Sequence, residues 1–236
     1  MALRAATRET LREYWAGRLG VAPDAFNSEG VTVGTTDEDG LTVFWCGDAV
    51  VVGAPEQLRH TAERQTDLLS AIDSTDGDEI RDWYGAFERV ETVLGPAFWG
   101  YTDEGAFEPV VSSARVLGRA DESAYASLRE AVPASAWDNG GPAFVPGETV
   151  GLFVDDDLVA ASGYDVWDDM LAHLAVVTHP DERGEGYGQA VVSRATELAV
   201  SEGLVPQYRT LAAWPWSVAL AESLGFERFA TGAVGL

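Results

Sequence analysis

Three glycines at alternate positions, Gly184, Gly186 and Gly188, are the strongest candidates in the sequence for part of a functional site. They follow an apolar stretch that ends near residue 178, and they precede a segment whose apolar residues repeat at helical spacing from 191 to 199. This order predicts a strand, a glycine-rich loop and a helix. The first N–H groups of a helix have no partner inside it, and the helix dipole favours a negative charge in front of them. Because glycine has no Cβ, the backbone can approach that charge closely. The pattern predicts a cradle for a phosphate or pyrophosphate.

The spacing of the glycines distinguishes between the known types of phosphate-binding loop. A Walker loop requires Gly-Lys followed by Ser or Thr, and the sequence contains no lysine. A dinucleotide fingerprint needs a different glycine spacing, early in a βαβ unit. The observed Arg183-x-x-Gly186-x-Gly188 resembles the acyl-CoA pyrophosphate loop of the GNAT N-acetyltransferase superfamily, whose pattern is Gln/Arg-x-x-Gly-x-Gly/Ala. A glycine-rich turn without a ligand is the alternative interpretation of the same residues.

The segments after the loop come in the order in which GNAT domains end. We expect a strand over 206–211, a short helix from Pro215, which suits a first helical position, and a last strand over about 226–231. Leu224-Gly225-Phe226 matches a signature of the family. The resemblance extends from about residue 112 to residue 236, and it is strongest to bacterial and archaeal GNAT acetyltransferases that carry an extra N-terminal region.

The resemblance implies an α/β (α+β) fold, in which a mixed, mostly antiparallel sheet is flanked by helices. It divides the chain into an N-terminal α/β region, residues 1–111, and a GNAT acetyltransferase domain, residues 112–236. The N-terminal region is either a decayed GNAT duplicate or an α/β cap that shapes the acceptor side. The implied activity is acyl-CoA-dependent N-acyl transfer, from acetyl-CoA to a primary amine on a small molecule or peptide.

Two positions depart from the family pattern. Trp214 stands where the family often has Asn, and Ala221 stands where it often has a Tyr that acts as general acid. CoA binding is therefore better supported than any particular catalytic residue. A non-enzymatic CoA-binding regulatory module is the alternative function, and a scaffold without a cofactor conflicts with the complete glycine loop.

The resemblance also implies which residues contact the cofactor. The strand that ends at Thr178 would pair its backbone with the pantetheine arm, while the loop N–H groups hold the pyrophosphate. Arg183 either places its guanidinium near a phosphate or contributes only its backbone. Ser217 either lies near the cofactor sulfur or caps its helix. The expected cofactor contacts are Val176, Val177, Thr178, Arg183, Gly184, Glu185, Gly186, Tyr187, Gly188, Gln189 and Ser217.

Acetyl transfer to an amine requires a neutral amine and a proton for the leaving thiolate. His173 lies on the strand that leads into the loop, close to where some superfamily members place a catalytic Glu, so it is the leading candidate for the base. A structural role is the alternative. Asp168 and Asp169, just before that strand, are candidates for binding a cationic acceptor or for acting through a water. We expect His60 at the surface and His179 in a capping or solvated position.

The composition limits the partners. With 39 acidic and 15 basic residues, the formal net charge is −24, so nucleic acid and anionic membranes are unsuitable partners. The charge suits either a cationic amine acceptor or a cytoplasm of high salt concentration. Because the acidic residues are spread over the whole chain, the second interpretation is favoured and suggests a halophilic, haloarchaeal source.

Other features of the sequence indicate a cytoplasmic protein, either monomeric or homodimeric. No apolar run approaches the ~20 residues of a membrane span, and residues 1–4 do not begin a signal peptide. Cys46, the single cysteine, is expected to be a buried apolar residue. The three aspartates 155–157 are expected in a tight turn, and no metal site is predicted.

The remaining elements follow from periodicity and from turn residues. Asp121 is expected to be the N-cap of a helix that contains Tyr125, and residues 139–147 are expected to form a loop near the acceptor. The expected helices elsewhere are 7–19, 55–72 and 80–94, and the expected strands are 31–35, 41–46, 49–52, 97–101, 149–154 and 158–164.

Overall fold

The computed structural model describes residues 2–236, which form two compact units. Unit 1 contains residues 2–3, Tyr101–Arg209 and Ala219–Glu227, whereas unit 2 contains Arg4–Gly100, Thr210–Val218 and Arg228–Leu236. Each unit draws on both halves of the sequence. The division of the sequence after residue 111 stays a prediction.

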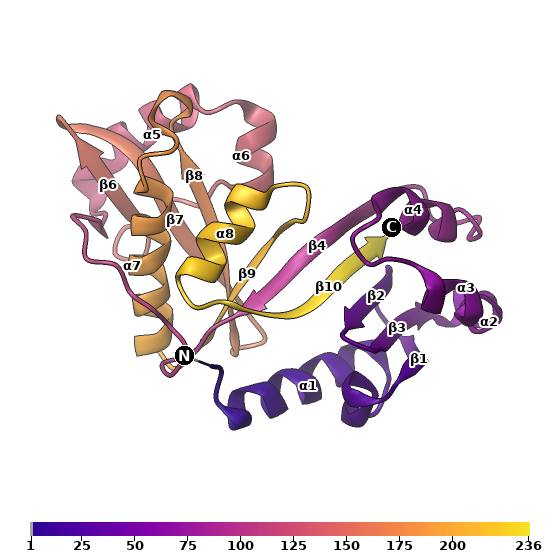
Figure 1. The fold of residues 1–236 in the computed structure, drawn as a ribbon. Coiled ribbons are helices and arrows are strands. Elements are labelled where there is room, and N and C mark those ends of the chain that lie inside the picture. The colour runs from indigo at the N-terminus through magenta and orange to yellow at the C-terminus, as the bar shows by residue number, and fades with distance from the viewer. Residues whose placement is uncertain (1) are drawn as a thin grey trace. The chain divides into compact units, whose positions relative to one another are not determined.

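Unit 1 is built on a sheet in the order β9-β8-β7-β6-β5. Neighbouring strands are antiparallel except β8 and β9, which run parallel. Helix α7 packs against β6, β7 and β8, while α5 packs on β7 and α6 on β8 (Figure 1). The strands are β5 (Arg115–Val116), β6 (Val150–Val154), β7 (Asp157–Trp167), β8 (Leu171–Thr178) and β9 (Val205–Leu211). The helical segments are η2 (Arg119–Asp121), α5 (Glu122–Ala131), α6 (Ala134–Gly140), η3 (Pro180–Glu182), α7 (Tyr187–Ser201) and α8 (Pro215–Ser223).

Helices α5 and α7 cover opposite faces of the unit 1 sheet. A Cβ at Gly188 of α7 would meet the side chains of Thr178 and Val176, so the even-numbered residues of β8 face α7. Val177 points the other way, into an apolar cluster with Tyr125 and other residues of α5 and α6. This mixed, mostly antiparallel sheet flanked by helices confirms the expected fold class.

In unit 2 the strands lie in the order β1-β3-β2-β10-β4. Strands β1 and β3 are parallel, and β2 pairs antiparallel with both β3 and β10. The last strand of the chain therefore completes a sheet made mainly from the first hundred residues. The elements are α1 (Ala5–Leu19), η1 (Pro23–Asn27), β1 (Gly30–Thr36), β2 (Leu41–Cys46), β3 (Ala49–Pro55), α2 (Glu56–Arg64), α3 (Thr66–Ala71), α4 (Gly77–Tyr84), β4 (Val93–Tyr101) and β10 (Glu227–Gly235).

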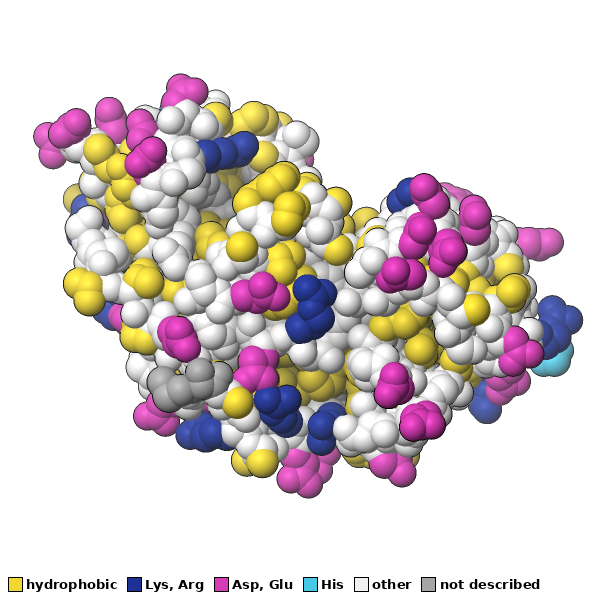
Figure 2. Space-filling model, viewed as in Figure 1, with side chains coloured by type: hydrophobic (Ala, Val, Ile, Leu, Met, Phe, Trp, Pro, Cys, Tyr) yellow, Lys and Arg dark blue, Asp and Glu magenta, His cyan; other side chains and the backbone are white. Residues whose placement is uncertain are grey.

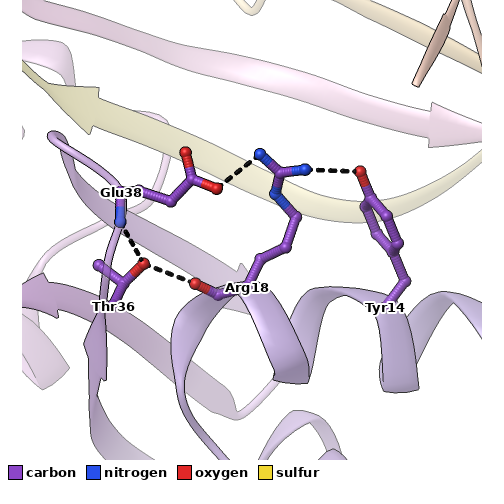
Figure 3. Close-up of polar contacts among 4 residues, drawn as sticks. All are labelled: Tyr14, Arg18, Thr36 and Glu38. Carbon is purple, nitrogen blue, oxygen red and sulfur yellow. Dashed lines mark hydrogen bonds and ion pairs between the residues drawn. The ribbon is translucent and has the colours of Figure 1, made fainter. Parts of the chain in front are cut away.

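A polar network joins the end of α1 to the end of β1 (Figure 3). The Arg18 guanidinium donates to the Tyr14 hydroxyl at 3.0 Å and to Glu38 Oε1 at 2.6 Å. The Thr36 hydroxyl donates to the Arg18 carbonyl at 2.6 Å and accepts the Glu38 N–H at 3.0 Å. One of the carbonyls left free at the helix end is thus satisfied by a strand residue.

Two of the predicted helices differ in the structure. The helix expected over 80–94 ends at Tyr84, and β4 starts at Val93. Phe87 and Val90 still pack in the core of unit 2, although they lie in a turn-containing segment without helix. Their helical spacing in the sequence therefore reflects burial rather than helix formation. The helix expected over 55–72 is divided at Gln65 into α2 and α3.

Near the start of unit 1 the cap and the loop also differ from expectation. Asp121 does precede α5, but its carboxylate accepts the N–H of Gly118 and the guanidinium of Arg115 and makes no cap bond to the helix. Part of the expected loop is helical, because α6 extends to Gly140. The aspartate turn is present, with Asp155 and Asp156 at positive φ.

Acidic side chains occur at many places on the face that Figure 2 draws. Figure 2 shows Asp and Glu side chains scattered there rather than gathered at one place. Between residues 2 and 236, no helix combines the length and the apolar character needed to cross a membrane. Cys46 is half-buried, and burial raises the pKa of its thiol to about 12, which keeps it protonated at neutral pH.

Candidate functional site

The glycine loop runs from η3 into α7 with left-handed backbone at two positions. Gly184 has φ 91° and Gly186 has φ 82°, values that residues with a Cβ rarely adopt. A Cβ at either position would meet no protein atom within 4 Å, so open space lies in front of both. At Gly188 a Cβ would lie 3.1 Å from Thr178 Oγ1, and glycine there lets α7 pack closely on β8.

The N–H groups of this loop have no acceptor from the chain itself. The first backbone bond of α7 is from the Ala190 N–H to the Gly186 carbonyl, at 3.0 Å. For residues 183–189, no acceptor within the described chain is found for the backbone N–H. Uncapped N–H groups at the start of a fifteen-residue helix form a site for an anion.

An open strand edge lies beside the loop. In the part of the chain described, β8 pairs with β9 only from Leu171 to His173, so the rest of β8 has no partner on that side. The His179 N–H bonds to the Val159 carbonyl of β7, at 2.7 Å. Because backbone direction alternates along a strand, Val176 and Thr178 present their N–H and C=O groups to the open side. Those of Val177 face β7.

The glycine loop, with its free N–H donors, and the open edge of β8 together fit an acyl-CoA. The N–H groups suit its pyrophosphate, and the strand edge suits the amide groups of its pantetheine arm. The side chains of Arg183 and Glu185 are exposed, and Tyr187 is half-buried. Gln189 donates through its side chain to Ser223 Oγ at 2.8 Å, so this amide is engaged within unit 1.

His173 is the best-connected of the three histidines. Its Nδ1 lies 2.8 Å from Gln207 Oε1, and its ring stacks on Trp167 with centroids 4.5 Å apart. The Gln207 amide nitrogen donates in turn to the hydroxyl of Tyr101, and both residues are fully buried. Since Oε1 only accepts, Nδ1 carries the proton and Nε2 carries the lone pair.

The surroundings keep His173 neutral near pH 7. Burial lowers the pKa of its imidazole, and the positive charge of Arg209 lowers it further. The hydrogen bond that Nδ1 donates to Gln207 and the charge of Asp165 act in the opposite direction. Asp165 is the direct partner of His173 in the β7–β8 ladder.

The two predicted aspartates occupy the tip of the β7–β8 hairpin. Asp168 has φ 52° and Asp169 has φ 53°, and both are exposed. The carboxylate that the structure brings opposite His173 belongs to Asp165, which the sequence did not indicate. His179 accepts the N–H of Asp181 at 3.3 Å, which confirms its capping position. His60 is exposed, as expected.

The residues of α8 divide between the two units. Ser217 is the third residue of α8 and belongs to unit 2, so it is not the residue that precedes the helix as a cap. Its contact with the cofactor stays a prediction. Ala221, at the usual Tyr position, is fully buried in unit 1 and offers no ionisable group.

A pocket of about 540 Å³ lies on the α5 and α6 side of the unit 1 sheet. Gly163 of β7 and Ala175 of β8, which are ladder partners, line its sheet side. Tyr125 and Trp137 line its helix side. Because ladder partners project from the same face of a sheet, Asp165 and His173 share this face with the pocket.

Comparison with known families finds a match in this region. Residues 119–226 match the model of the Acetyltransferase (GNAT) family. This GNAT segment includes α5, the pocket, β8, the glycine loop and α8, and it ends at Phe226 of the Leu-Gly-Phe signature. No curated protein matches the sequence.

Several solved structures are similar to this chain, and one of them reaches a TM-score of 0.50. An acetyltransferase of the GNAT family from Colwellia psychrerythraea aligns with a TM-score of 0.50 and 15% identity, over 67% of this chain and 62% of that one. A GNAT-family protein from Novosphingobium aromaticivorans aligns with a TM-score of 0.48 and 25% identity, over 62% of this chain and 65% of that one. A GCN5-related N-acetyltransferase-like protein from Streptococcus suis aligns with a TM-score of 0.47 and 16% identity, over 98% and 99%. The chain thus spans less than two thirds of the first two structures.

Proposed function

We propose that this protein transfers the acetyl group of acetyl-CoA to a primary amine, as an N-acyltransferase. The observation that carries the proposal is the row of N–H groups at residues 183–189, which have no acceptor in the described chain. They lie within the GNAT segment, beside the open edge of β8. In this proposal residues 112–236 form the acetyltransferase domain, residues 1–111 form the additional N-terminal α/β region, and the protein acts in the cytoplasm.

Each part of the loop has a task in this proposal. The N–H groups from Arg183 to Gly188 hold the pyrophosphate, while the backbone of Val176 and Thr178 aligns the pantetheine arm along β8. Bound acetyl-CoA supplies an activated acyl carbon as a thioester. Such positioning makes the attack of the amine effectively intramolecular.

His173 is the proposed general base. Its Nε2 holds a lone pair, because Nδ1 donates to Gln207, and its lowered pKa leaves it unprotonated at neutral pH. The amine must lose a proton to attack the thioester, and Nε2 accepts it, directly or through a water. Since Ala221 has no ionisable group, solvent protonates the leaving thiolate. Asp168 and Asp169, at the exposed hairpin tip, are proposed to attract a cationic acceptor.

Gly186→Val tests cofactor binding, with Gly203→Val as its matched control. Gly186 has φ 82° and Gly203 has φ 81°, and a Cβ at either meets no atom within 4 Å, so the backbone strain is the same. Only Gly186 lies in the N–H row. We expect Gly186→Val to weaken acetyl-CoA binding at least tenfold in isothermal titration, and Gly203→Val to bind like the parent. Equal loss in both variants would contradict the cradle.

A non-enzymatic CoA-binding regulatory module is the second candidate, favoured by the buried Ala221 at the usual position of the general acid. Release of free CoA thiol from acetyl-CoA, in the presence of a panel of amines, separates the two. Tight binding of acetyl-CoA without thiol release for any amine would support the regulatory module.

A further inference from the structure

The pocket of unit 1 has preformed aromatic walls. The Tyr125 ring lies 5.5 Å from Trp137, edge-on at 84°, and 4.8 Å from Phe144. The Tyr125 hydroxyl donates to the carbonyl of Pro142, which fixes the loop after α6. The volume of the pocket, about 540 Å³, is typical of a site for a small molecule.

The charges of the pocket differ between its two sides. On the sheet side, Asp165 lines the pocket beside His173. On the helix side, Arg129 of α5 also lines it, with its guanidinium carbon 5.2 Å from the centre of the Trp137 ring. Within residues 2–236 Arg129 makes no ion pair, although acidic residues outnumber basic ones by 39 to 15. A second carboxylate, Glu148, also lines the pocket.

This arrangement matches the charges of a zwitterion. A carboxylate accepts hydrogen bonds from an arginine fork, and an ammonium is attracted by a carboxylate. A polyamine would bring a second cation against Arg129, and an amine without an acidic group would leave Arg129 unused. An apolar side chain would complement the rings of Tyr125, Trp137 and Phe144.

We propose that the acceptor is a free α-amino acid with an apolar side chain. Its ammonium lies toward Asp165 and His173, and its carboxylate binds Arg129. The inference rests on the proposed function for its chemistry, but the pocket itself lies apart from the glycine loop.

The chemistry of the step balances. The ammonium gives one proton to His173 Nε2, which passes it to solvent, and the neutral amine forms a bond to the acetyl carbon as the carbon–sulfur bond breaks. The nitrogen then loses its second proton to solvent, and the thiolate takes a proton from solvent. The products are an N-acetyl amino acid, the CoA thiol and one proton released to solvent.

Three acceptors with the same benzyl body separate the possibilities: L-phenylalanine, L-phenylalaninamide and phenethylamine. Compared at equal concentration of neutral amine, we expect kcat/KM for phenylalanine to exceed that for the amide at least tenfold, because only the acid has a carboxylate for Arg129. Arg129→Met should bring this ratio close to one. Arg119→Met is the matched control, since Arg119 is exposed in η2 and does not line the pocket, and it should leave the ratio unchanged.

Binding measurements separate failure of this inference from failure of the proposed function. Isothermal titration of L-phenylalanine without acetyl-CoA should show binding that Arg129→Met weakens at least tenfold, even if acetyl-CoA does not bind. Binding of acetyl-CoA with no binding or acetylation of apolar amino acids would overturn the inference and leave the cofactor site intact. Preferential acetylation of polyamines or of peptide N-termini would also overturn it.

Discussion

The hydrogen bond between His173 and Gln207 connects the imidazole to a fully buried residue. Gln207 is held by Tyr101, so its amide oxygen stays directed at the imidazole Nδ1. In this role Gln207 is a positioning residue, because it sets which nitrogen of His173 carries the lone pair. Stacking on Trp167 fixes the plane of the same ring.

The lowered pKa of His173 sets the pH dependence that we expect. The base is lost when the imidazole is protonated, so activity should fall as pH decreases through a pKa below the usual 6.5 or so. Gln207→Leu removes a bond that raises this pKa, so the acid limb of kcat/KM should move to still lower pH, while kcat falls. His173→Ala should abolish the limb and lower kcat at least tenfold, in the range of ~10²–10⁴ for a general base.

NMR of the imidazole nitrogens measures both the pKa of His173 and its tautomer, with His60→Ala as the control for an exposed histidine. If the acid limb stayed in place in His173→Ala, the base would lie elsewhere, and the aspartates would be the next candidates.

Some site residues could be read from the sequence, and others could not. The glycine loop was found because its chemistry is local, within seven residues. Asp165 was not found, because its place opposite His173 depends on the hairpin register, 167 paired with 171. A two-residue turn at Asp168 and Asp169 would have shifted that register by one. Asp165 would then pair with Ala172, and His173 would lie on the opposite face of the sheet.

At the scale of elements, prediction succeeded where sequence pattern and local structure coincide. Helix α7 and strands β2, β7 and β8 follow clear apolar patterns between turn residues. Prediction failed between residues 85 and 94, where Phe87 and Val90 are placed in the core by turns. Periodicity reports which side chains are buried, and tertiary packing decides the backbone that buries them.

The turn before α5 offers a stability test at this scale. The Asp121 carboxylate accepts two bonds from Arg115, at 2.7 and 2.9 Å, and one from the Gly118 N–H at 2.7 Å. These interactions, first the one with Arg115, lower the pKa of Asp121 to about 2. A carboxyl group whose pKa is lowered by folding stabilises the fold at pH values above the pKa of an unfolded Asp, about 3.9. This stability is lost as the pH falls toward 2.

Asp121→Asn should therefore destabilise the protein at pH 7 by about 0.5–1 kcal/mol, the discounted value of an exposed ion pair, and by progressively less below pH 4. Denaturant unfolding at pH 7 and pH 3 measures the difference. Asp138→Asn, at an exposed position of α6, is the control and should have no effect. If the destabilisation by Asp121→Asn did not change with pH, the charge of the Asp121 carboxylate would not be what stabilises the fold.

For the whole molecule, the topology could not be foreseen from local patterns. Strand β10 follows the GNAT segment in sequence, yet it pairs with β2, some 190 residues earlier in the chain. Likewise the pocket joins α5 to residues of β7 and β8 that come about 40 residues later. Such long-range pairings are set by the packing of complete sheets, about which single-segment patterns contain no information.

The net charge of −24 leads to the last prediction, which concerns salt. Like charges scattered over the surface repel one another in the compact state, and the repulsion decreases as the Debye length falls from ~10 Å at 0.1 M to ~3 Å at 1 M salt. Tm should therefore rise with KCl between 0.05 and 1 M. Sucrose at equal osmolality is the control, because it stabilises by exclusion from the surface without screening charge. A protein adapted to a saline cytoplasm should gain more from KCl than from sucrose, whereas a Tm indifferent to KCl would contradict the halophilic interpretation of the acidic surface.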